Sequence, residues 1–282
     1  MRPRPGRQTS AVRRWVIAIA GRPTGDVDVP GAVQALAPLR DLTVVWQNQL
    51  GGLTFELGGT SERAFVKWAP AGTGLDLAAE AARMRWAGPF TPVPQVLDLG
   101  VDDEGAWLVT SPLPGQGAVS DRWRADPATA VTAIGEGLRA LHDALPVERC
   151  PFSWSVDARL AAARADADAR GRRPDDGRVT HDGRTVQDAL DGLGDPPPIE
   201  QLVVCHGDAC APNTIVADDA RWSGHVDLGA LGVADRWADL AIATWSTEWN
   251  YGPGWEEHLL EAYGVEGDAR RTDYYRLLWD VT

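Results

Sequence analysis

The N-terminal third of the chain alternates short hydrophobic segments with glycine-bearing turns. Valine, leucine, tryptophan and phenylalanine recur in these segments, which is typical of β-strands. Strands are expected in residues 64–69, in 106–113 and on both sides of a glycine turn within 41–59. The alanine-rich stretch 75–87 is predicted to be a helix, because alanine is the best helix former. The pattern therefore predicts a small sheet with one helix.

The rest of the chain has mainly the hydrophobic spacing of helices. One helix is expected to start at Asp126, a capping residue, with Pro127 in the first turn. Its apolar residues Val131, Ile134 and Leu138 follow at helical intervals. Further helices are predicted over residues 157–170, 236–247, 254–263 and 272–280.

Two short strands are expected within this helical part. The stretch "QLVVCHGD" (201–208) is predicted to be a buried strand entering a loop, and "WSGHVDLG" (222–229) is predicted to be its hairpin partner. The polar, glycine-bearing stretch 171–184 is expected to be a mobile loop. The whole pattern indicates an α+β protein with a small sheet followed by a larger helical part.

The chain is divided on this basis into three parts. Residues 1–40 hold seven arginines and two aspartates, and we expect a basic, partly disordered N-terminal extension. Residues 41–113 are expected to form the small sheet lobe, and 114–282 the helical lobe. The stretch "RRWVIAIAG" (13–21) is similar to an export signal, but its apolar core is too short.

Charge and cysteine content narrow the class of partner. The net charge of −13 argues against nucleic acid, whose phosphates would be repelled, and suits a small cationic partner. No apolar run is long enough to span a bilayer, so we expect no membrane association. The three cysteines show no disulfide or zinc framework, which favours reduced thiols and a cytoplasmic location.

A group of hard oxygen ligands follows the predicted buried strand. Asp208 lies on the loop after that strand, Asn213 follows five residues later, and Asp227 ends the next strand. Such oxygens bind Mg²⁺, and a carboxylate left over can accept a proton from an attacking hydroxyl. That combination is what phosphoryl transfer requires. The alternative is an ordinary loop rich in aspartate and asparagine.

Lysine is used once in this chain. Of its 27 basic residues only Lys67, on a predicted strand, is lysine. This indicates a site that a guanidinium does not fit, since lysine carries a compact point charge and arginine a flat fork. The alternative is chance.

Three motifs resemble one family of enzymes. "HGDACAPN" followed by "DLG" matches the H-x-D-x₄-N and D-x-G pattern of the kinase catalytic loop. Together, residues 203–216, 224–244 and 274–280 resemble the aminoglycoside phosphotransferases, especially the 3′-phosphotransferase group. The resemblance covers about residues 43–282 in the family's order. It implies a bilobal protein-kinase-like fold and transfer of the γ-phosphoryl group of ATP to a hydroxyl of an aminoglycoside, with the 3′-hydroxyl expected, which confers antibiotic resistance. GTP is left open as the donor.

The resemblance also implies roles for individual residues. Asp208 is the expected catalytic base, and Asn213 and Asp227 are the expected Mg²⁺ ligands. Lys67 is expected to contact the nucleotide phosphates and to pair with Glu80. His206 is expected to orient the loop.

Nucleotide contacts are expected at two further places. The turn within 48–55 contains Gly51 and Gly52, whose backbone N–H groups are expected to approach the phosphates. In the stretch 110–115, which resembles the hinge between lobes, the Ser111 carbonyl and the Leu113 N–H are expected to bond the purine.

The substrate pocket departs from the family's pattern. Near the chain end, two adjacent acids of relatives are replaced here by Trp279 and Asp280, and Ala230 stands where relatives often carry arginine. The expected substrate-binding acids are Asp280, Glu248 and Asp182. Trp279 is expected either to stack on a sugar ring or to fill the core. These departures keep a second hypothesis open, a kinase of the same fold for another small metabolite or a different antibiotic.

Two other classes of protein are weighed against this reading. A nucleotide-binding protein without turnover is expected to lack one of Lys67, Asp208, Asn213 or Asp227, and all four are present. A protein kinase is disfavoured by the acidic character and by the missing A-P-E signature. The sequence leaves the oligomeric state open.

Overall fold

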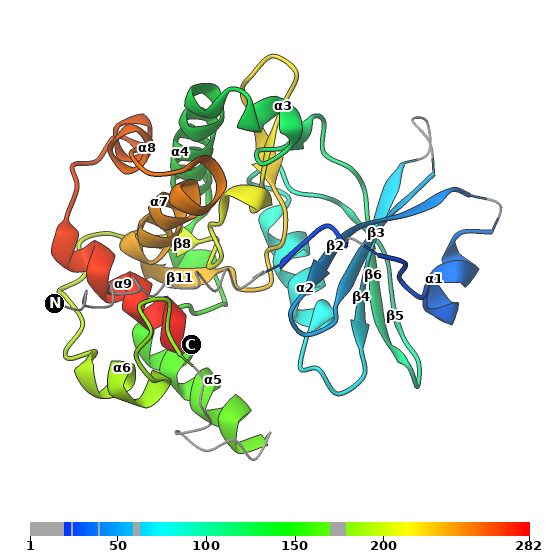
Figure 1. Ribbon diagram of the computed structural model, residues 1–282, viewed down its shortest axis with the longest axis horizontal. Helices are drawn as coiled ribbons and strands as arrows, with labels where there is room; N and C mark the ends of the chain where they lie inside the picture. Colours follow the sequence, from blue (N-terminus) through cyan, green and yellow to red (C-terminus); the bar gives the residue numbers. More distant parts are fainter. Residues whose placement is uncertain (1–19, 24, 39, 59–62, 170–178) are drawn as a thin grey trace, which may run out of the picture.

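The computed structural model describes residues 20–23, 25–38, 40–58, 63–169 and 179–282. Figure 1 shows two lobes, a sheet on one side and a larger bundle of helices on the other. The sheet of the N-lobe has six strands in the order β1-β2-β3-β4-β6-β5, and every neighbouring pair is antiparallel. The strands are β1 (Ala20–Gly21), β2 (Leu42–Asn48), β3 (Leu53–Leu57), β4 (Ala64–Pro70), β5 (Val96–Val101) and β6 (Gly105–Thr110).

The described part of the N-lobe contains two helices rather than one. Helix α2 (Leu77–Ala87) lies between the sheet and the C-lobe (Figure 1), and it is capped by Asp76, whose side chain accepts the N–H of Ala79. Helix α1 (Gly31–Leu36) is short. Its Val33 is fully buried in an apolar cluster with residues of β3, β4 and β6.

This packing changes the expectation for the N-terminal 40 residues. Val27 and Val29 pack against the same cluster as Val33, and β1 pairs with β2. The part of residues 1–40 that the structure describes is therefore integrated into the N-lobe, because its valines are buried there. The expectation for residues 1–19 lies outside the described residues, and the division at residues 40 and 113 stays a prediction.

The C-lobe is built mainly from helices, as predicted. Helix α4 begins at Pro127 with Asp126 as its N-cap, and α5 spans the alanine-rich stretch. Pairs α4 with α8 and α7 with α9 pack against each other. The helices are α3 (Asp121–Arg124), α4 (Pro127–Ala144), α5 (Val156–Ala169), α6 (Val186–Gly192), α7 (Trp237–Tyr251), α8 (Glu256–Tyr263) and α9 (Ala269–Val281), with 3-10 turns η1 (Val147–Arg149) and η2 (Ala211–Asn213).

The strand pairing predicted in this lobe is wrong. Strand β8 (Leu202–Cys205) pairs with β11 (Gly232–Asp235), whereas β10 (Trp222–His225) pairs with β9 (Thr214–Val216), which in turn pairs with β7 (Gln116–Gly117). The short turn after β9, with Ala220 at a positive φ of 68°, closes a local hairpin. That short connection competes successfully with the longer one from β8 to β10, because a short loop costs less entropy to close.

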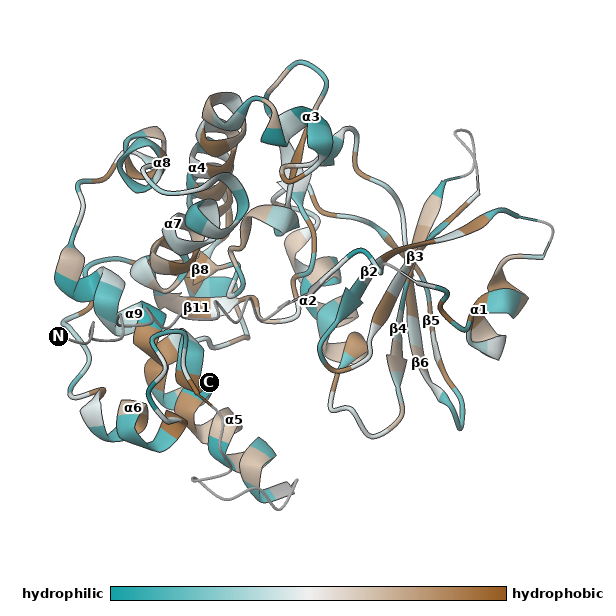
Figure 2. Cartoon of the chain, viewed as in Figure 1, coloured by the Kyte–Doolittle hydropathy of each residue, from teal (hydrophilic) through white to brown (hydrophobic). Residues whose placement is uncertain are grey.

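One apolar core runs through the C-lobe and continues under α2 and β6. Figure 2 shows hydrophobic residues along α4 and β8, the elements at the centre of this lobe. The bilobal α+β fold expected from the resemblance is confirmed. The expected mobile loop falls largely on residues 170–178, outside the described residues. No helix in the described ranges has the length and hydrophobicity needed to cross a bilayer.

Candidate active site

The loop after β8 brings Asp208 and Asn213 into direct contact. The Nδ2 atom of Asn213 donates to the backbone carbonyl of Asp208 at 2.9 Å and to its Oδ2 at 3.0 Å. Asn213 ends the 3-10 turn η2, and its backbone carbonyl accepts the N–H of Val226, which precedes Asp227. The two predicted loops therefore form one unit.

Asp208 carries the features of a proton acceptor. Its Oδ1 atom is buried and has no hydrogen-bond partner of standard geometry among the described residues, although the Cys210 thiol lies near enough to Asp208 to lower its pKa. Burial raises the pKa of Asp208, and the nearby Asp227 carboxylate raises it further. A buried carboxylate with an unused oxygen is prepared to accept a proton from a bound hydroxyl.

Lys67 connects the two lobes at this point. From strand β4 its Nζ atom lies 2.8 Å from Oε1 of Glu80 on α2 and 2.7 Å from Oδ1 of Asp227. Burial alone lowers the pKa of Lys67, but the carboxylates of Asp227 and Glu80 outweigh it and raise the pKa above its ordinary value. Asp227 has a positive φ of 66°, a conformation rare for residues other than glycine. The predicted pair of Lys67 with Glu80 is present, and Lys67 also bonds Asp227, the expected Mg²⁺ ligand.

His206 orients the catalytic loop from within. Its Nδ1 atom accepts the N–H of Asp208 at 3.2 Å, so Nε2 carries the proton and donates to the carbonyl of Val226 at 2.9 Å. The ring is completely buried. This agrees with the structural role expected for His206.

Asp239 was missed by the sequence analysis. From the first turn of α7 its carboxylate accepts the backbone N–H groups of His206 at 2.5 Å and Gly207 at 2.9 Å. It also bonds His142 at 3.0 Å, and Tyr263 bonds the other nitrogen of that ring. Although burial raises the pKa of Asp239, the bond from His142 lowers it overall. The sequence signal was an aspartate within the mostly apolar stretch "ADRWADLA". The partners of Asp239 lie too far away in sequence to be identified from that signal.

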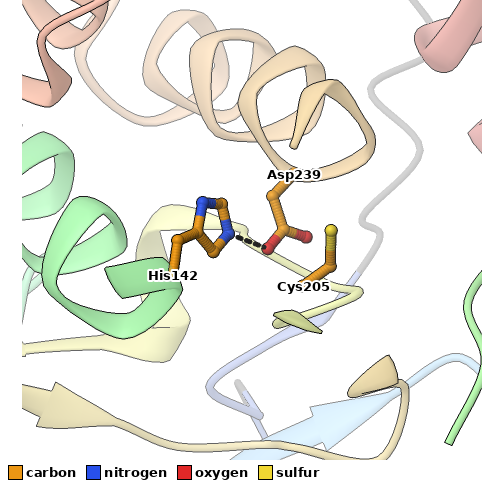
Figure 3. A group of neighbouring side chains, drawn as sticks. All are labelled: His142, Cys205 and Asp239. Carbon is orange, nitrogen blue, oxygen red and sulfur yellow. Dashed lines mark hydrogen bonds and ion pairs between the residues drawn. The ribbon is translucent and has the colours of Figure 1, made fainter. Parts of the chain in front are cut away.

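The same buried group includes Cys205 and has the composition of a metal site (Figure 3). Its ligand atoms are already used, because both Asp239 oxygens accept backbone N–H groups and the Cys205 thiol donates to the carbonyl of Asp235. Burial raises the pKa of Cys205 well above its ordinary value, so the thiol keeps its proton. A metal ion needs the thiolate, and the group is therefore a hydrogen-bonded anchor of the catalytic loop.

The two glycines expected to approach phosphates are in a tight turn. Gly51 has a φ of +83° and donates its N–H to the carbonyl of Asn48, while the Gly52 N–H donates to Asn48 Oδ1 at 2.8 Å. A Cβ on Gly52 would lie 2.7 Å from the Asn48 side chain. In this conformation both amides are used within the turn, contrary to the expectation of open amides.

The expected hinge joins β6 to the C-lobe. The N–H of Ser111 donates to the Gln95 carbonyl, and its hydroxyl accepts the Gln95 N–H at 2.9 Å. Neither the Ser111 carbonyl nor the Leu113 N–H takes part in a hydrogen bond between described residues. Their position is compatible with the purine contacts expected of them.

The three expected substrate acids are placed differently from one another. Asp280 is bonded to His181 through both the ring Nδ1 and the backbone N–H. Asp182 is paired with Arg184 at 2.6 Å, which lowers its pKa below its ordinary range. Glu248 is exposed on α7. Two of the three therefore line a pocket, but each is already paired there with a histidine or an arginine of the chain.

The catalytic loop has the donor set of a Mg²⁺ site. Asn213 uses its amide nitrogen on Asp208, which leaves its Oδ1 for a cation, and Asp227 uses only one oxygen on Lys67. Nearly half of the Asp227 side chain, 45%, is exposed. Carboxylate and amide oxygens beside an unpartnered Asp208 oxygen fit a small hard cation.

The two-lobed fold and this site define a kinase-like phosphotransferase. The chain belongs to the phosphotransferase enzyme family, whose family model matches residues 47–275. The resemblance to aminoglycoside phosphotransferases is confirmed, because similar proteins carry that name. The aminoglycoside 3′-phosphotransferase of Streptomyces fradiae is 40% identical over 257 residues, which cover 86% of this chain and 95% of the relative.

Solved structures agree with this placement. An aminoglycoside 3′-phosphotransferase of type VIII is 32% identical with a TM-score of 0.73, covering 89% of this chain and 97% of that one. An aminoglycoside phosphotransferase of Streptomyces rimosus, solved in complex with ADP and streptomycin, is 30% identical with a TM-score of 0.63, covering 81% and 90% of the two chains.

Proposed function

We propose that this protein transfers the γ-phosphoryl group of ATP to the 3′-hydroxyl of an aminoglycoside and thereby confers resistance to it. The observation that carries the proposal is the joined arrangement of Lys67, Asp227, Asn213 and Asp208. Lys67 of the N-lobe pairs with Asp227 of the C-lobe, and Asn213 bonds Asp208 within the C-lobe. The relative from Streptomyces fradiae bears the name of this activity at 40% identity. The ADP complex of the Streptomyces rimosus relative supports a nucleotide donor.

Some of these residues are proposed to act on the nucleotide phosphates and one on the acceptor hydroxyl. Asp208 accepts the proton of the attacking hydroxyl with its buried oxygen, so the nucleophile is strengthened as it attacks. Lys67 places its charge on the nucleotide phosphates and is kept in position by Glu80. Asn213 and Asp227 would hold Mg²⁺, which neutralises phosphate charge during transfer.

The acceptor is proposed to be a polycation on two grounds. The chain carries a net charge of −13, which attracts cations over a distance. The named relatives are aminoglycoside enzymes. We keep the expectations of no nucleic acid partner, no membrane partner and a cytoplasmic location as part of this proposal.

One observation favours a second candidate. The pairing of Asp280 with His181 and of Asp182 with Arg184 reduces the charge presented to an acceptor. An acceptor with fewer ammonium groups than a typical aminoglycoside, such as another small metabolite, suits that arrangement better.

A panel of acceptors in an ADP-release assay separates the two candidates. Kanamycin B is expected to stimulate release, and tobramycin, which lacks only the 3′-hydroxyl, is expected not to. Streptomycin tests acceptance at another ring, and ethanolamine tests the small-metabolite candidate. Equal release with kanamycin B and tobramycin would contradict the 3′ assignment, and release with ethanolamine alone would contradict the aminoglycoside proposal.

A further inference from the structure

Helix α2, which carries Glu80 and lies between the sheet and the C-lobe (Figure 1), is bonded to the C-lobe one turn after that residue. The Nε atom of Arg83 donates to the backbone carbonyl of Leu231 at 3.0 Å, across 148 positions of sequence. Its Nη1 atom donates to the Ala79 carbonyl of the same helix at 3.2 Å. One guanidinium therefore connects the backbone of α2 to residues 227–231, which we call the Asp227 loop.

An aromatic ring of the C-lobe supports this guanidinium. Cζ of Arg83 lies 4.8 Å from the ring centroid of Phe152, a distance at which a cation is attracted to the ring face. Trp86, three residues further along α2, meets the same ring edge-on at 6.1 Å. Phe152 is itself fixed to β11, because its backbone carbonyl accepts the N–H of Val233 at 2.9 Å. The carbonyl and the ring that Arg83 contacts therefore belong to one connected part of the C-lobe.

Glu80 and Arg83 both face the Asp227 loop. Residues three apart on a helix lie on the same side of it. A Cβ on Gly229 would lie 4.0 Å from the Cβ and from Oε2 of Glu80, which is ordinary van der Waals contact. Glu80 thus lies against residue 229, and Arg83 bonds residue 231. Two contacts one turn apart fix the rotation of α2 about its axis as well as its distance from the loop.

The Asp227 loop in turn touches the catalytic loop. A Cβ on Gly207 would lie 2.2 Å from the carbonyl oxygen of Ala230, so these two backbones are in direct contact. Gly207 has a positive φ of 86° and directly precedes Asp208, the proposed base. Contacts therefore run from Arg83 through residues 229–231 to the position before the base.

The bond from Arg83 fixes α2 in a way that the Lys67 ion pairs alone do not. Lys67 bonds Glu80 at 2.8 Å and Asp227 at 2.7 Å through flexible side chains. Such side chains follow a small shift of the helix by rotating, and an ion pair costs side-chain entropy to keep in one geometry. A backbone carbonyl has no such freedom, so the bond to Leu231 sets the position of the helix itself.

We propose that Arg83 is a positioning residue for phosphoryl transfer, which holds α2 against the Asp227 loop and thereby keeps Glu80 directed at Lys67. Arg83 acts through these two residues, since its own bonds go to backbone carbonyls. The kinetic effect of this role rests on the proposed function. The position of α2 can be measured without any acceptor.

Amide hydrogen exchange of α2 tests the position of the helix directly. Arg83→Met keeps an unbranched side chain that can cover Phe152 but has no donor for the Leu231 carbonyl. We expect the α2 amides to exchange about 10-fold faster in Arg83→Met than in the parent, with no change in α4, because one charge-assisted hydrogen bond is lost. Arg85→Ala, at an exposed position of the same helix, is the matched control. Equal exchange of α2 in Arg83→Met and the parent would overturn the proposal.

Kinetics test whether Arg83 acts on nucleotide use. With kanamycin B as acceptor, Arg83→Met is expected to lower kcat/KM for ATP about 10-fold, while the KM for kanamycin B stays within about twofold of the parent. Arg83→Lys retains a charged donor for the Leu231 carbonyl and is expected to recover part of the loss, which also keeps the test decisive if Arg83→Met does not fold. A KM for kanamycin B that rises as much as that for ATP would overturn the proposal, since a general disturbance explains both.

A double-mutant cycle with Glu80 tests whether the two residues act through one ion pair. Glu80→Gln removes the carboxylate charge that Arg83 is proposed to keep in place. If both act on Lys67, the loss of kcat/KM for ATP in Glu80→Gln combined with Arg83→Met is smaller than the product of the two single losses, by about 3-fold or more. Single losses that multiply would show independent effects and overturn the proposal.

The outcomes separate this role from the proposed function. Turnover of kanamycin B with the parent's kcat/KM for ATP in Arg83→Met overturns the role of Arg83 and leaves the function standing. Absence of turnover with every aminoglycoside overturns the proposed function. The exchange of α2 and the affinity for ADP, measured by calorimetric titration and expected to fall in Arg83→Met but not in Arg85→Ala, then decide on Arg83.

Discussion

The Nζ atom of Lys67 lies 2.7 Å from Oδ1 of Asp227, so a strand of the N-lobe is bonded to the C-lobe loop that carries Asp227. Glu80 holds the same ammonium group from α2 at 2.8 Å. One lysine therefore couples the position of the sheet to the position of the catalytic loop. This relationship explains why the single lysine of the chain stands at this site, since a compact cation fits between two carboxylates.

Replacing Lys67 by arginine is expected to impair nucleotide use although the charge is kept. The flat guanidinium cannot place one donor between Glu80 and Asp227 as an ammonium does. We expect kcat/KM for ATP to fall about 10- to 100-fold, the equivalent of one charge-assisted hydrogen bond. The control is Arg63→Lys, which changes a partly exposed pair with Glu56 on the same sheet. Equal kcat and KM in Lys67→Arg and the parent would show that the lysine is incidental.

Asp208→Asn is expected to retain nucleotide binding and lose most turnover. The amide cannot accept the hydroxyl proton, and general-base assistance is worth about 10²–10⁴-fold in rate. Steady-state kinetics give kcat, and calorimetric titration with ADP tests binding. Asp219→Asn, an exposed aspartate paired with Arg221, is the control. A kcat within about threefold of the parent would contradict the assignment of Asp208 as the base.

Asp239→Asn is expected to weaken the hydrogen bonds that hold the loop at His206 and Gly207. The carboxylate accepts two backbone N–H groups and a bond from His142, and a neutral amide replaces only part of this. We expect the free energy of unfolding to fall by about 1.5–3 kcal/mol, with a fall in kcat as the loop loses its position. Asp143→Asn, an exposed pair with Arg139, is the control for denaturant unfolding. A stable variant with full kcat would remove the anchoring role.

His225 is expected to make the protein sensitive to mild acid. Burial, with contributions from His206 and His142, lowers its pKa well below the ordinary 6.5. Above pH 6.5 the site is neutral in both states, so stability is complete. Below it the unfolded chain binds a proton that the folded chain does not, and the free energy of unfolding falls by about 1.4 kcal/mol per pH unit.

Unfolding by urea at several pH values measures this slope. His225→Asn is expected to be less stable throughout and to lose the slope between pH 6.5 and 5. His258→Gln, at a partly exposed position, serves as the control. The same slope in His225→Asn and the parent would assign the acid sensitivity to other groups.

Val33→Ala is expected to destabilise the N-lobe. The side chain is completely buried among residues of β3, β4 and β6. Removal of two methyl groups together with the cavity left behind costs about 1.5–3 kcal/mol. Thermal unfolding measures the loss, with Ala35→Ser at an exposed position of the same helix as the control. An unchanged melting temperature would mean that the burial of Val33 does not contribute to the stability of the N-lobe.

Much of the fold was predictable because its signals are local. Helix α4 starts at the capping residue Asp126, as expected, and the alanine-rich stretches form α2 and α5. The catalytic loop was predictable for the same reason, since Asp208 and Asn213 are five residues apart and meet within one turn. Strand pairing was harder to predict from the sequence. The wrong partner was predicted for β10 because several short strands of similar composition could pair with it.

The sequence by itself placed the four residues that we propose to carry the chemistry, Asp208, Asn213, Asp227 and Lys67, in recognisable motifs. Tertiary structure decided how they are held, through Asp239 under the loop and the bond from Lys67 to Asp227. It also decided that Asp280 pairs with His181, which lies among three tryptophans at the edge of a pocket. The physical reason is sequence distance: His181 and Asp280 are 99 positions apart, and no local pattern encodes which distant side chains share a surface once the core has packed.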